Sequence, residues 1–286
     1  MRIYLDCLPC FFRQALEAAR AATDDEYVHR RVLDSVASMI PEIPLDARPP
    51  EIAHQVHTLI SRLTGNSDPY REAKTKANEM ALALYPRLKK AVADSEDPVL
   101  AACKLSIAGN TMDLAPKSNY SDLDSIIGSA LTSPLAINDY QEFLKSIREA
   151  SHILYLGDNA GEIVFDRLLI EELHQIKRFE ISFVVRERPI INDVTWHDAV
   201  SVGLDKVADI VSSGSDAPAT ILSQCSPEML GLYRASDIII AKGQGNYESL
   251  SEEQSNIFFL LRVKCPIVAR LLHANMDDAI LKGQLI

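Results

Sequence analysis

The stretch "HILYLGDNAGEIVFD", residues 152–166, passes from a short apolar run to a polar loop and then to a helical pattern. An apolar run without polar alternation is typical of a strand whose two faces are both covered in a parallel sheet. Three other apolar runs, within 179–187, 208–214 and 236–246, are each followed by Gly, Asp, Asn or Ser and then by a helical segment. The second half of the chain is therefore predicted to be α/β with a mainly parallel sheet, to which 256–272 adds one or two closing strands.

The first half of the chain is predicted to be helical, because its apolar residues recur at helical spacing and no alternation with period two is sustained. Seven helices are expected, within 10–25, 29–40, 49–63, 71–93, 98–114 (stopping near Gly109), 123–133 and 137–151. We expect an all-helical domain over residues 1–147 and an α/β domain over 148–286. The stretch 66–70 is a candidate joint between subdomains.

Composition narrows the classes of partner. The chain has 286 residues, 47% of them hydrophobic, and a formal net charge of -11. An acidic surface repels phosphate backbones and anionic lipid heads, so we expect neither nucleic acid nor a membrane as partner. No window approaches the roughly 20 apolar residues of a membrane span, and the N-terminus does not resemble a signal peptide. Five cysteines in a chain of this length favour a reducing cytoplasm over a disulfide scaffold.

Polar side chains follow two of the predicted strands. Asp158 and Asn159 come after the first strand, and Asp193 follows the second. Ligands of an open parallel sheet collect at the carboxyl ends of its strands. Two carboxylates and an amide carbonyl meeting there would suit a hard divalent cation. The alternative is capping: Asp158 or Asn159 would cap the following helix, and Asn192 or Asp193 would cap a helix over 193–204.

The stretch "KGQGNYESL", 242–250, follows a third strand at the same edge of the sheet. The backbone N–H groups of Gly243 and Gly245 could form a nest for an anion, with Lys242 as a point charge and Asn246 as a donor. The alternative is a glycine-rich turn with an exposed lysine. The chain has no Walker A sequence and no G-x-G-x-x-G in its first strand-to-helix turn, so a nucleoside triphosphatase or a dinucleotide enzyme is not indicated.

Other motifs leave more than one interpretation open. Cys7-x-x-Cys10 stands at a predicted helix start and could be a redox pair, half of a zinc site or two half-buried thiols. His54-x-x-His57 is expected to be a pair of surface histidines. Asn110 serves as an ordinary helix C-cap unless it reaches the sheet edge. Glu162 is either a solvated helix residue or a supporting group of the site.

Six motifs in this order resemble one family. They are "CLPCFFRQAL" (7–16), "SDPYREAK" (67–74), "AGNTMD" (108–113), "LGDNAGEIVFD" (156–166), "PIINDVT" (189–195) and "AKGQGNYESL" (241–250). The chain is similar to the DUF89, or ARMT1-like, family of metal-dependent damage-control phosphatases, in its prokaryotic branch with an N-terminal C-x-x-C. The resemblance implies a helical portion packed on a Rossmann-like, three-layer α/β/α domain.

The resemblance also implies the parts of a site. A divalent metal (Mg, Mn, Co or Ni) would be held by Asp158, Asn159 and Asp193, and a phosphate by residues Lys242 to Asn246. The activity implied is hydrolysis of small phosphomonoesters, such as sugar phosphates or damaged phosphometabolites. Other branches of the family differ at the "KGQGN" position, so substrates do not carry over from them.

The expected chemistry is metal-assisted phosphoryl transfer in a cytoplasmic enzyme. The metal would neutralise phosphoryl oxygens, and Lys242 with the Gly243–Gly245 amides would hold the remaining oxygens. The nucleophile would be an activated water or the carboxylate of Asp158, while Asn110 and Asn192 would orient the substrate.

Two alternative functions remain open: a non-catalytic metal- or small-molecule-binding protein, and an S-adenosylmethionine-dependent methyltransferase. "GDNAGE" suits the latter poorly, because a carboxylate stands where the cofactor needs only backbone. The oligomeric state is left open.

Overall fold

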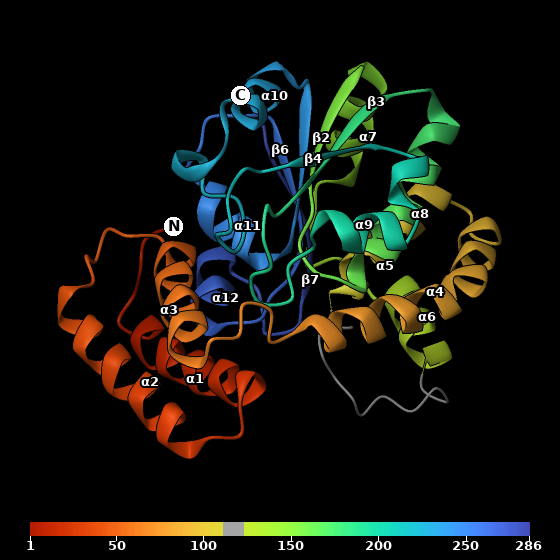
Figure 1. The fold of residues 1–286 in the computed structure, drawn as a ribbon. Helices are drawn as coiled ribbons and strands as arrows, with labels where there is room; N and C mark the ends of the chain where they lie inside the picture. Colours follow the sequence, from red (N-terminus) through yellow and green to blue (C-terminus); the bar gives the residue numbers. More distant parts are fainter. Residues whose placement is uncertain (111–122) are drawn as a thin grey trace.

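The computed structural model describes residues 1–110 and 123–286. Its helices and strands alternate in the second half of the chain, around one central sheet (Figure 1). The mixed α/β class predicted from the sequence is confirmed, and the sheet is mainly parallel. The part of the "AGNTMD" motif beyond Asn110 lies outside the described residues.

The helices of the first half begin and end close to their predicted limits. They are α1 (Cys7–Ala22), α2 (Glu26–Met39), the short 3-10 helix η1 (Ile40–Glu42), α3 (Pro49–Thr64), α4 (Arg71–Ala93), α5 (Pro98–Gly109), α6 (Leu123–Thr132) and α7 (Tyr140–Glu149). Local chemistry fixes several ends: the Asp97 carboxylate accepts a hydrogen bond from the Leu100 amide and caps α5. Gly65, at φ +69°, ends α3 in the left-handed conformation that glycine adopts without strain.

Within the part of the chain that the structure describes, the sheet has seven strands in the order β1-β7-β6-β5-β2-β3-β4. The strands are β1 (Ile137–Asn138), β2 (His152–Leu156), β3 (Glu180–Val185), β4 (Asp209–Ser212), β5 (Ile238–Lys242), β6 (Ile257–Arg262) and β7 (Ala279–Gln284). Among these strands, all of which lie within the described residues, only the β6–β7 pair is antiparallel. Counted from β2, the five consecutive strands β2 to β6 stand in the order 3-2-1-4-5, which is that of doubly wound sheets.

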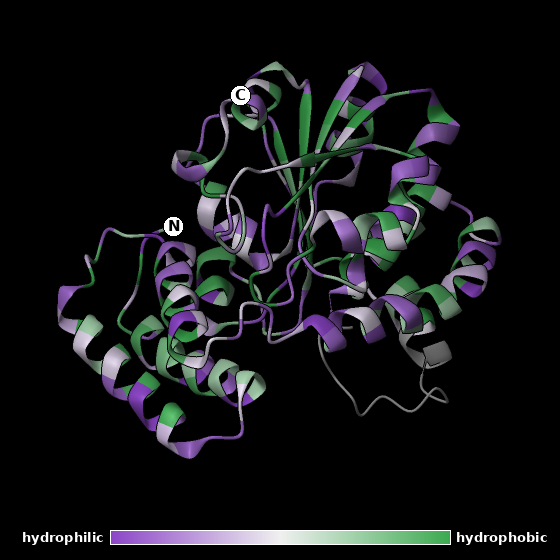
Figure 2. Cartoon of the chain, in the orientation of Figure 1, coloured by the Kyte–Doolittle hydropathy of each residue, from purple (hydrophilic) through white to green (hydrophobic). Residues whose placement is uncertain are grey.

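The helices of the second half cover both faces of this sheet. They are α8 (Glu162–Ile176), α9 (Trp196–Ser201), α10 (Pro227–Ala235), α11 (Gly243–Leu250) and α12 (Pro266–Leu272), with the 3-10 turns η3 (Leu204–Lys206) and η4 (Leu222–Gln224). Along β2, Ile153 and Tyr155 belong to the core shared with α4, α5, α7 and α8, whereas Leu154 and Leu156 belong to the core shared with α10, α11 and α12. Figure 2 shows the strands as largely hydrophobic and the surrounding helices as two-sided.

Some elements near the end of the chain and at one edge of the sheet differ from the sequence-based prediction. Of the expected closing strands, β6 is present, but the following residues form α12, because Pro266 opens a helix that the Cys265 side chain caps. In the last strand, β7, Lys282 and Gly283 follow only three apolar residues. The two-residue strand β1 lies in the half predicted as helical. Both missed strands lie at one edge of the sheet, where pairing depends on neighbours rather than on local pattern.

The first-half helices fall into two groups by packing. Helices α1, α2 and α3 enclose a separate core that includes Phe11, Val32 and Ile60. Helices α4 to α7 instead share the core on one face of the sheet. The change from one core to the other lies between α3 and α4. The α1–α3 unit is tied to the sheet domain by Arg48, whose guanidinium lies 2.8 Å from the Glu253 carboxylate.

No described helix combines the length and the apolar character needed to span a bilayer.

Candidate functional site at the switch point of the sheet

The candidate site lies where the direction of winding reverses. Strands β2 and β5 are parallel neighbours, but the chain leaves β2 for α8 on one face and leaves β5 for α11 on the other. The loops after the two strands therefore diverge and leave a crevice between them, which is where doubly wound sheets bind ligands. Asp158 stands two residues after β2, and Gly243 follows β5 directly.

Asp158 lies directly against the backbone of Gly243. A Cβ atom built on Gly243 would stand 1.9 Å from Asp158 Oδ2 and 2.3 Å from its Cγ. Gly243 also has φ +78°, in the left-handed region. Only glycine satisfies both conditions, so the carboxylate position and residue 243 depend on each other.

Two loops pair to bring the expected metal ligands together. Asn159 and Asp193 form an isolated antiparallel β-bridge. The Val194 amide donates to the Asp158 carbonyl at 2.9 Å, and the Ala160 amide donates to the Asn192 carbonyl at the same distance. Backbone hydrogen bonds therefore hold the loop after β2 against the loop that carries Asp193.

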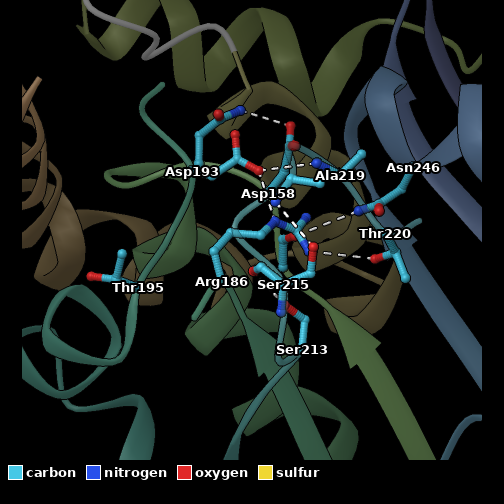
Figure 3. A network of polar contacts seen from close by, with 12 residues as sticks. Asp158, Arg186, Asp193, Thr195, Ser213, Ser215, Ala219, Thr220 and Asn246 are labelled. Atoms are coloured by element: carbon cyan, nitrogen blue, oxygen red, sulfur yellow. Dashed lines mark hydrogen bonds and ion pairs between the residues drawn. The ribbon is translucent and has the colours of Figure 1, made fainter. Parts of the chain in front are cut away.

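Asp193 is held by a buried arginine. Arg186 is fully buried, and its Nε donates to Asp193 Oδ2 at 2.8 Å (Figure 3). The Ala219 amide donates to the same oxygen at 3.2 Å, and Arg186 Nη2 donates to the Gly157 carbonyl at 3.2 Å. One guanidinium thus connects Asp193 to the end of β2. Sequence reasoning missed Arg186, although a charged residue at the end of the apolar run "FVVR" was a usable signal.

The capping alternative is not what the structure shows. Helix α9 begins at Trp196, and Thr195 forms its capping box with Asp198, so neither Asn192 nor Asp193 caps it. The N-cap of α8 is Gly161, which makes no side-chain cap. Its backbone N–H instead donates to Asn78 Oδ1 at 2.6 Å.

Two carboxamides bind the carboxylates of the site. Asn110 Nδ2 donates to Asp158 Oδ2 at 3.0 Å and to Glu162 Oε2 at 2.7 Å. Asn159 Nδ2 donates to the same two oxygens at 2.7 and 3.2 Å. Asn110 therefore reaches the sheet edge from the end of α5, the exception allowed for above. Its Oδ1 is buried and has no hydrogen-bond partner among the described residues.

Lys242 lies beneath the site rather than facing a ligand. It is fully buried, and its Nζ donates to Glu162 Oε1 at 2.5 Å, to Asp166 Oδ1 at 2.7 Å and to the Ser106 carbonyl at 3.0 Å. Three acceptors use all three N–H bonds of an ammonium group. The expectation of a direct contact from Lys242 to phosphate, and the alternative of an exposed lysine, both disagree with this geometry.

The group around Lys242 is an internal ion cluster. Burial raises the pKa of Asp166 to about 6, with Lys242 opposing that rise and Glu162 adding to it. Burial by itself would lower the pKa of Lys242, but Asp166 and Glu162 raise it above its usual value. Tyr155 OH and Ser106 Oγ also donate to Asp166 Oδ1, at 2.8 and 2.7 Å. Sequence reasoning named Lys242 and Glu162 but not Asp166.

A cavity of about 1080 Å³ opens onto these residues. It is lined by the expected site residues Asn110, Asp158, Asn159, Asn192, Asp193 and Gly245. Asn246 lies behind the wall, where its Nδ2 donates to the Lys242 carbonyl at 2.7 Å and to the Gly157 carbonyl at 3.4 Å and ties β5 to β2. The opposite wall comes from the α1–α3 unit and includes Cys7 and Cys10.

The donor set near the cavity consists of carboxylates and carboxamides. Within residues 1–110 and 123–286, no group of three or more His, Cys, Asp or Glu side chains is arranged to hold a metal ion. The set that meets at the cavity is instead Asp158 and Asp193 with the amides Asn110 and Asn159. Mixed carboxylate and amide oxygens are ligands of hard divalent cations.

Comparisons with known proteins agree with this architecture. The family model described as the damage-control phosphatase ARMT1-like domain matches residues 3–280. A damage-control phosphatase of Pyrococcus horikoshii is 36% identical, over 95% of this chain and 94% of the relative. One from Archaeoglobus fulgidus is 34% identical, over 99% of each chain. An uncharacterized protein of Methanocaldococcus jannaschii is 33% identical, over 98% of this chain and 95% of the relative.

Among solved structures, the crystal structure of a DUF89 family protein from Pyrococcus horikoshii superposes with a TM-score of 0.93, at 33% identity and 99% coverage of both chains. Sequence, fold and the order of the motifs agree over nearly the whole length of the chain. The chain therefore belongs to the DUF89 family of damage-control phosphatase ARMT1-like domains.

Proposed function

We propose that this protein is a divalent-metal-dependent phosphatase that hydrolyses small phosphomonoesters. The observation that carries the proposal is the pairing of the loops after β2 and β3, which brings Asp158, Asn159 and Asp193 to the floor of one cavity. Membership of a family with members named damage-control phosphatases supports the same reaction class.

The residues at the cavity floor fit a hard divalent cation. Asn110 Oδ1 is a buried oxygen without a partner among the described residues, which a metal or a water on it would satisfy. The residues that would hold the ion are Asp158, Asn159 and Asp193. When bound, the ion would supply positive charge to phosphoryl oxygens and an activated nucleophile near neutral pH.

The protein's own groups position these donors. Arg186 fixes one carboxylate oxygen of Asp193, and Asn110 and Asn159 fix one carboxylate oxygen of Asp158. Such fixed dipoles need no reorganisation when charge develops on the substrate. The first turn of α11 adds backbone N–H groups at the crevice, where Gln244 and Gly245 line the cavity. Lys242 takes part indirectly, through Glu162.

The test uses an aryl phosphate with Mg²⁺, Mn²⁺, Co²⁺ or Ni²⁺ added in turn. We expect turnover that chelator removes, and a loss of at least 100-fold in kcat for Asp158→Asn and for Asp193→Asn. Asp205→Ala is the matched control, because Asp205 is exposed in η3 and does not line the cavity. It should keep wild-type activity.

Two outcomes would favour the alternatives. Metal binding in a calorimeter without turnover of any phosphorylated metabolite would indicate a non-catalytic binding protein. Tight binding of S-adenosylmethionine, unaffected by chelator, would indicate a methyltransferase. Full activity in Asp158→Asn would refute the assignment of the site.

A further inference from the structure

The large cavity continues away from the Asp158–Asp193 floor toward the α1–α3 unit. A second cavity of about 420 Å³ adjoins it on that side. Of the residues that the structure describes, three line both cavities: His57 of α3, Tyr70 just before α4, and Ile191 next to Asn192. They mark the boundary that a ligand longer than a phosphoryl group would meet.

His57 is a buried polar side chain that lines this boundary. Only 9% of its surface is exposed, contrary to the expectation of a surface histidine. Its imidazole makes no hydrogen bond within the described parts of the chain, whereas His54, one helical turn earlier, bonds to the Asp216 carboxylate at 3.0 Å. Buried polar groups are nearly always paired with protein, water or a ligand. Water or a ligand group inside the cavity is therefore the expected partner of His57.

The protonation state of His57 limits what that partner can be. Burial lowers the pKa of His57 to about 4, and the neighbouring His54 lowers it as well. The ring is consequently neutral at pH 7 and offers one N–H donor and one acceptor nitrogen. An anionic group would gain no ion pair from this ring.

Tyr70 has the same character. Burial raises the pKa of its hydroxyl to about 12, and Glu17 adds to that rise, so the phenol stays protonated. The described residues supply no hydrogen-bond partner for this hydroxyl, and the side chain lines both cavities. It can therefore donate and accept, as the neutral imidazole can.

The third boundary residue, Ile191, has a strained backbone conformation next to the site. Ile191 has φ +46°, an outlier for a β-branched residue. Such strain persists only where the surroundings impose it, and it collects at ligand sites. Ile191 contributes an apolar side chain to the lining of both cavities, directly before Asn192 and Asp193.

We propose that His57 and Tyr70 form a recognition subsite for the organic part of the substrate, and that this subsite selects uncharged hydroxyl or carbonyl groups. The inference rests on the proposed function, in which the phosphoryl group lies at Asp158 and Asp193. It identifies the α1–α3 unit as the part of the molecule that reads the substrate beyond its phosphate.

The test compares two substrates. A hexose phosphate presents hydroxyl groups to the subsite, whereas an aryl phosphate presents none. For the hexose phosphate, His57→Leu and Tyr70→Phe should each raise KM roughly 2- to 12-fold, the equivalent of one hydrogen bond, and leave kcat unchanged within error. For the aryl phosphate, both constants should stay within about twofold of wild type.

His57→Gln is the matched control, because glutamine keeps a donor and an acceptor; it should recover most of the hexose phosphate KM. Thermal unfolding of each variant shows whether it is folded. Equal effects on both substrates, or an unchanged KM for the hexose phosphate, would overturn the inference.

A second experiment measures the binding of hexose phosphate to the metal-free protein by calorimetry, which repeats the comparison without turnover. Suppose that the wild-type protein shows no turnover but binds hexose phosphate more tightly than His57→Leu does. That result would sustain the subsite and overturn the phosphatase proposal alone.

Discussion

The contact between Gly243 and Asp158 gives the sharpest prediction about the site. In Gly243→Ala, the new Cβ would stand 1.9 Å from Asp158 Oδ2, whereas carbon and oxygen in contact are about 3.2 Å apart. The carboxylate must move by roughly 1.3 Å, or the start of α11 must shift. A displacement of about 1 Å at a reacting centre is worth roughly 100-fold in rate. We therefore expect kcat on an aryl phosphate to fall by about that factor or more.

Stability should fall as well. The left-handed φ of residue 243 costs a non-glycine residue about 1–2 kcal/mol, and overpacking typically costs another 1–3 kcal/mol. The free energy of unfolding should drop by roughly 2–5 kcal/mol in urea titrations. Gly65→Ala separates the two contributions, because Gly65 has φ +69° but no atom within 4 Å of its Cβ position. It should lose only the backbone contribution and keep full activity.

A second control lacks both features. Gly231 lies inside α10 with open space around its Cβ position, so Gly231→Ala should be neutral or stabilising by up to about 1 kcal/mol. If Gly243→Ala proved as mild as Gly65→Ala and remained active, the close approach of Asp158 to the backbone would have no functional weight.

Three further predictions concern the charges around the site. Arg186→Met leaves the buried Asp193 carboxylate without its guanidinium and should lower the free energy of unfolding by about 3–5 kcal/mol. In the same urea titration, Arg30→Met, which removes an exposed ion pair with Asp34, should change the free energy of unfolding by less than about 0.5 kcal/mol. The pKa of His57 is lowered to about 4, so the free energy of unfolding of the wild type should fall by roughly 2–3 kcal/mol, relative to that of His57→Gln, as pH falls from 6.5 to 4. An equal pH dependence of the two proteins in urea titrations across that range would contradict this prediction. Under the metal proposal, Mn²⁺ should raise Tm of the chelator-treated wild type but not of a variant with Asp193→Asn.

The outline of the fold could be read from local patterns. Helical periodicity located α1 to α7 within a few residues, and apolar runs followed by polar loops located β2 to β6. Strand β7 was missed because Lys282 and Gly283 interrupt its apolar character, and it is held by pairing with β6. Pairing of this kind is a property of the assembled sheet and leaves little trace in one segment.

The candidate site divides in the same manner. Asp158, Asn159 and Asp193 were recognisable because oxygen-bearing side chains follow successive strands, and parallel strands end at the same edge of a sheet. The role of Lys242 was not recognisable, because the sequence shows only a lysine beside glycines. It does not indicate that Lys242 binds Glu162 and Asp166, which lie one helical turn apart in α8. Its orientation follows from the packing of α8 over β5.

The sequence by itself determined the alternation of strands and helices, the helical first half and the identity of the groups that meet at the sheet edge. It could do so because hydrophobic periodicity, caps and turns act over a few neighbouring residues. Only the tertiary structure decided that Asn159 bridges Asp193, that Lys242 points inward and that His57 is buried against the cavity. These outcomes depend on which surfaces are brought together from distant parts of the chain, and burial then sets the charge and the hydrogen-bonding needs of each group.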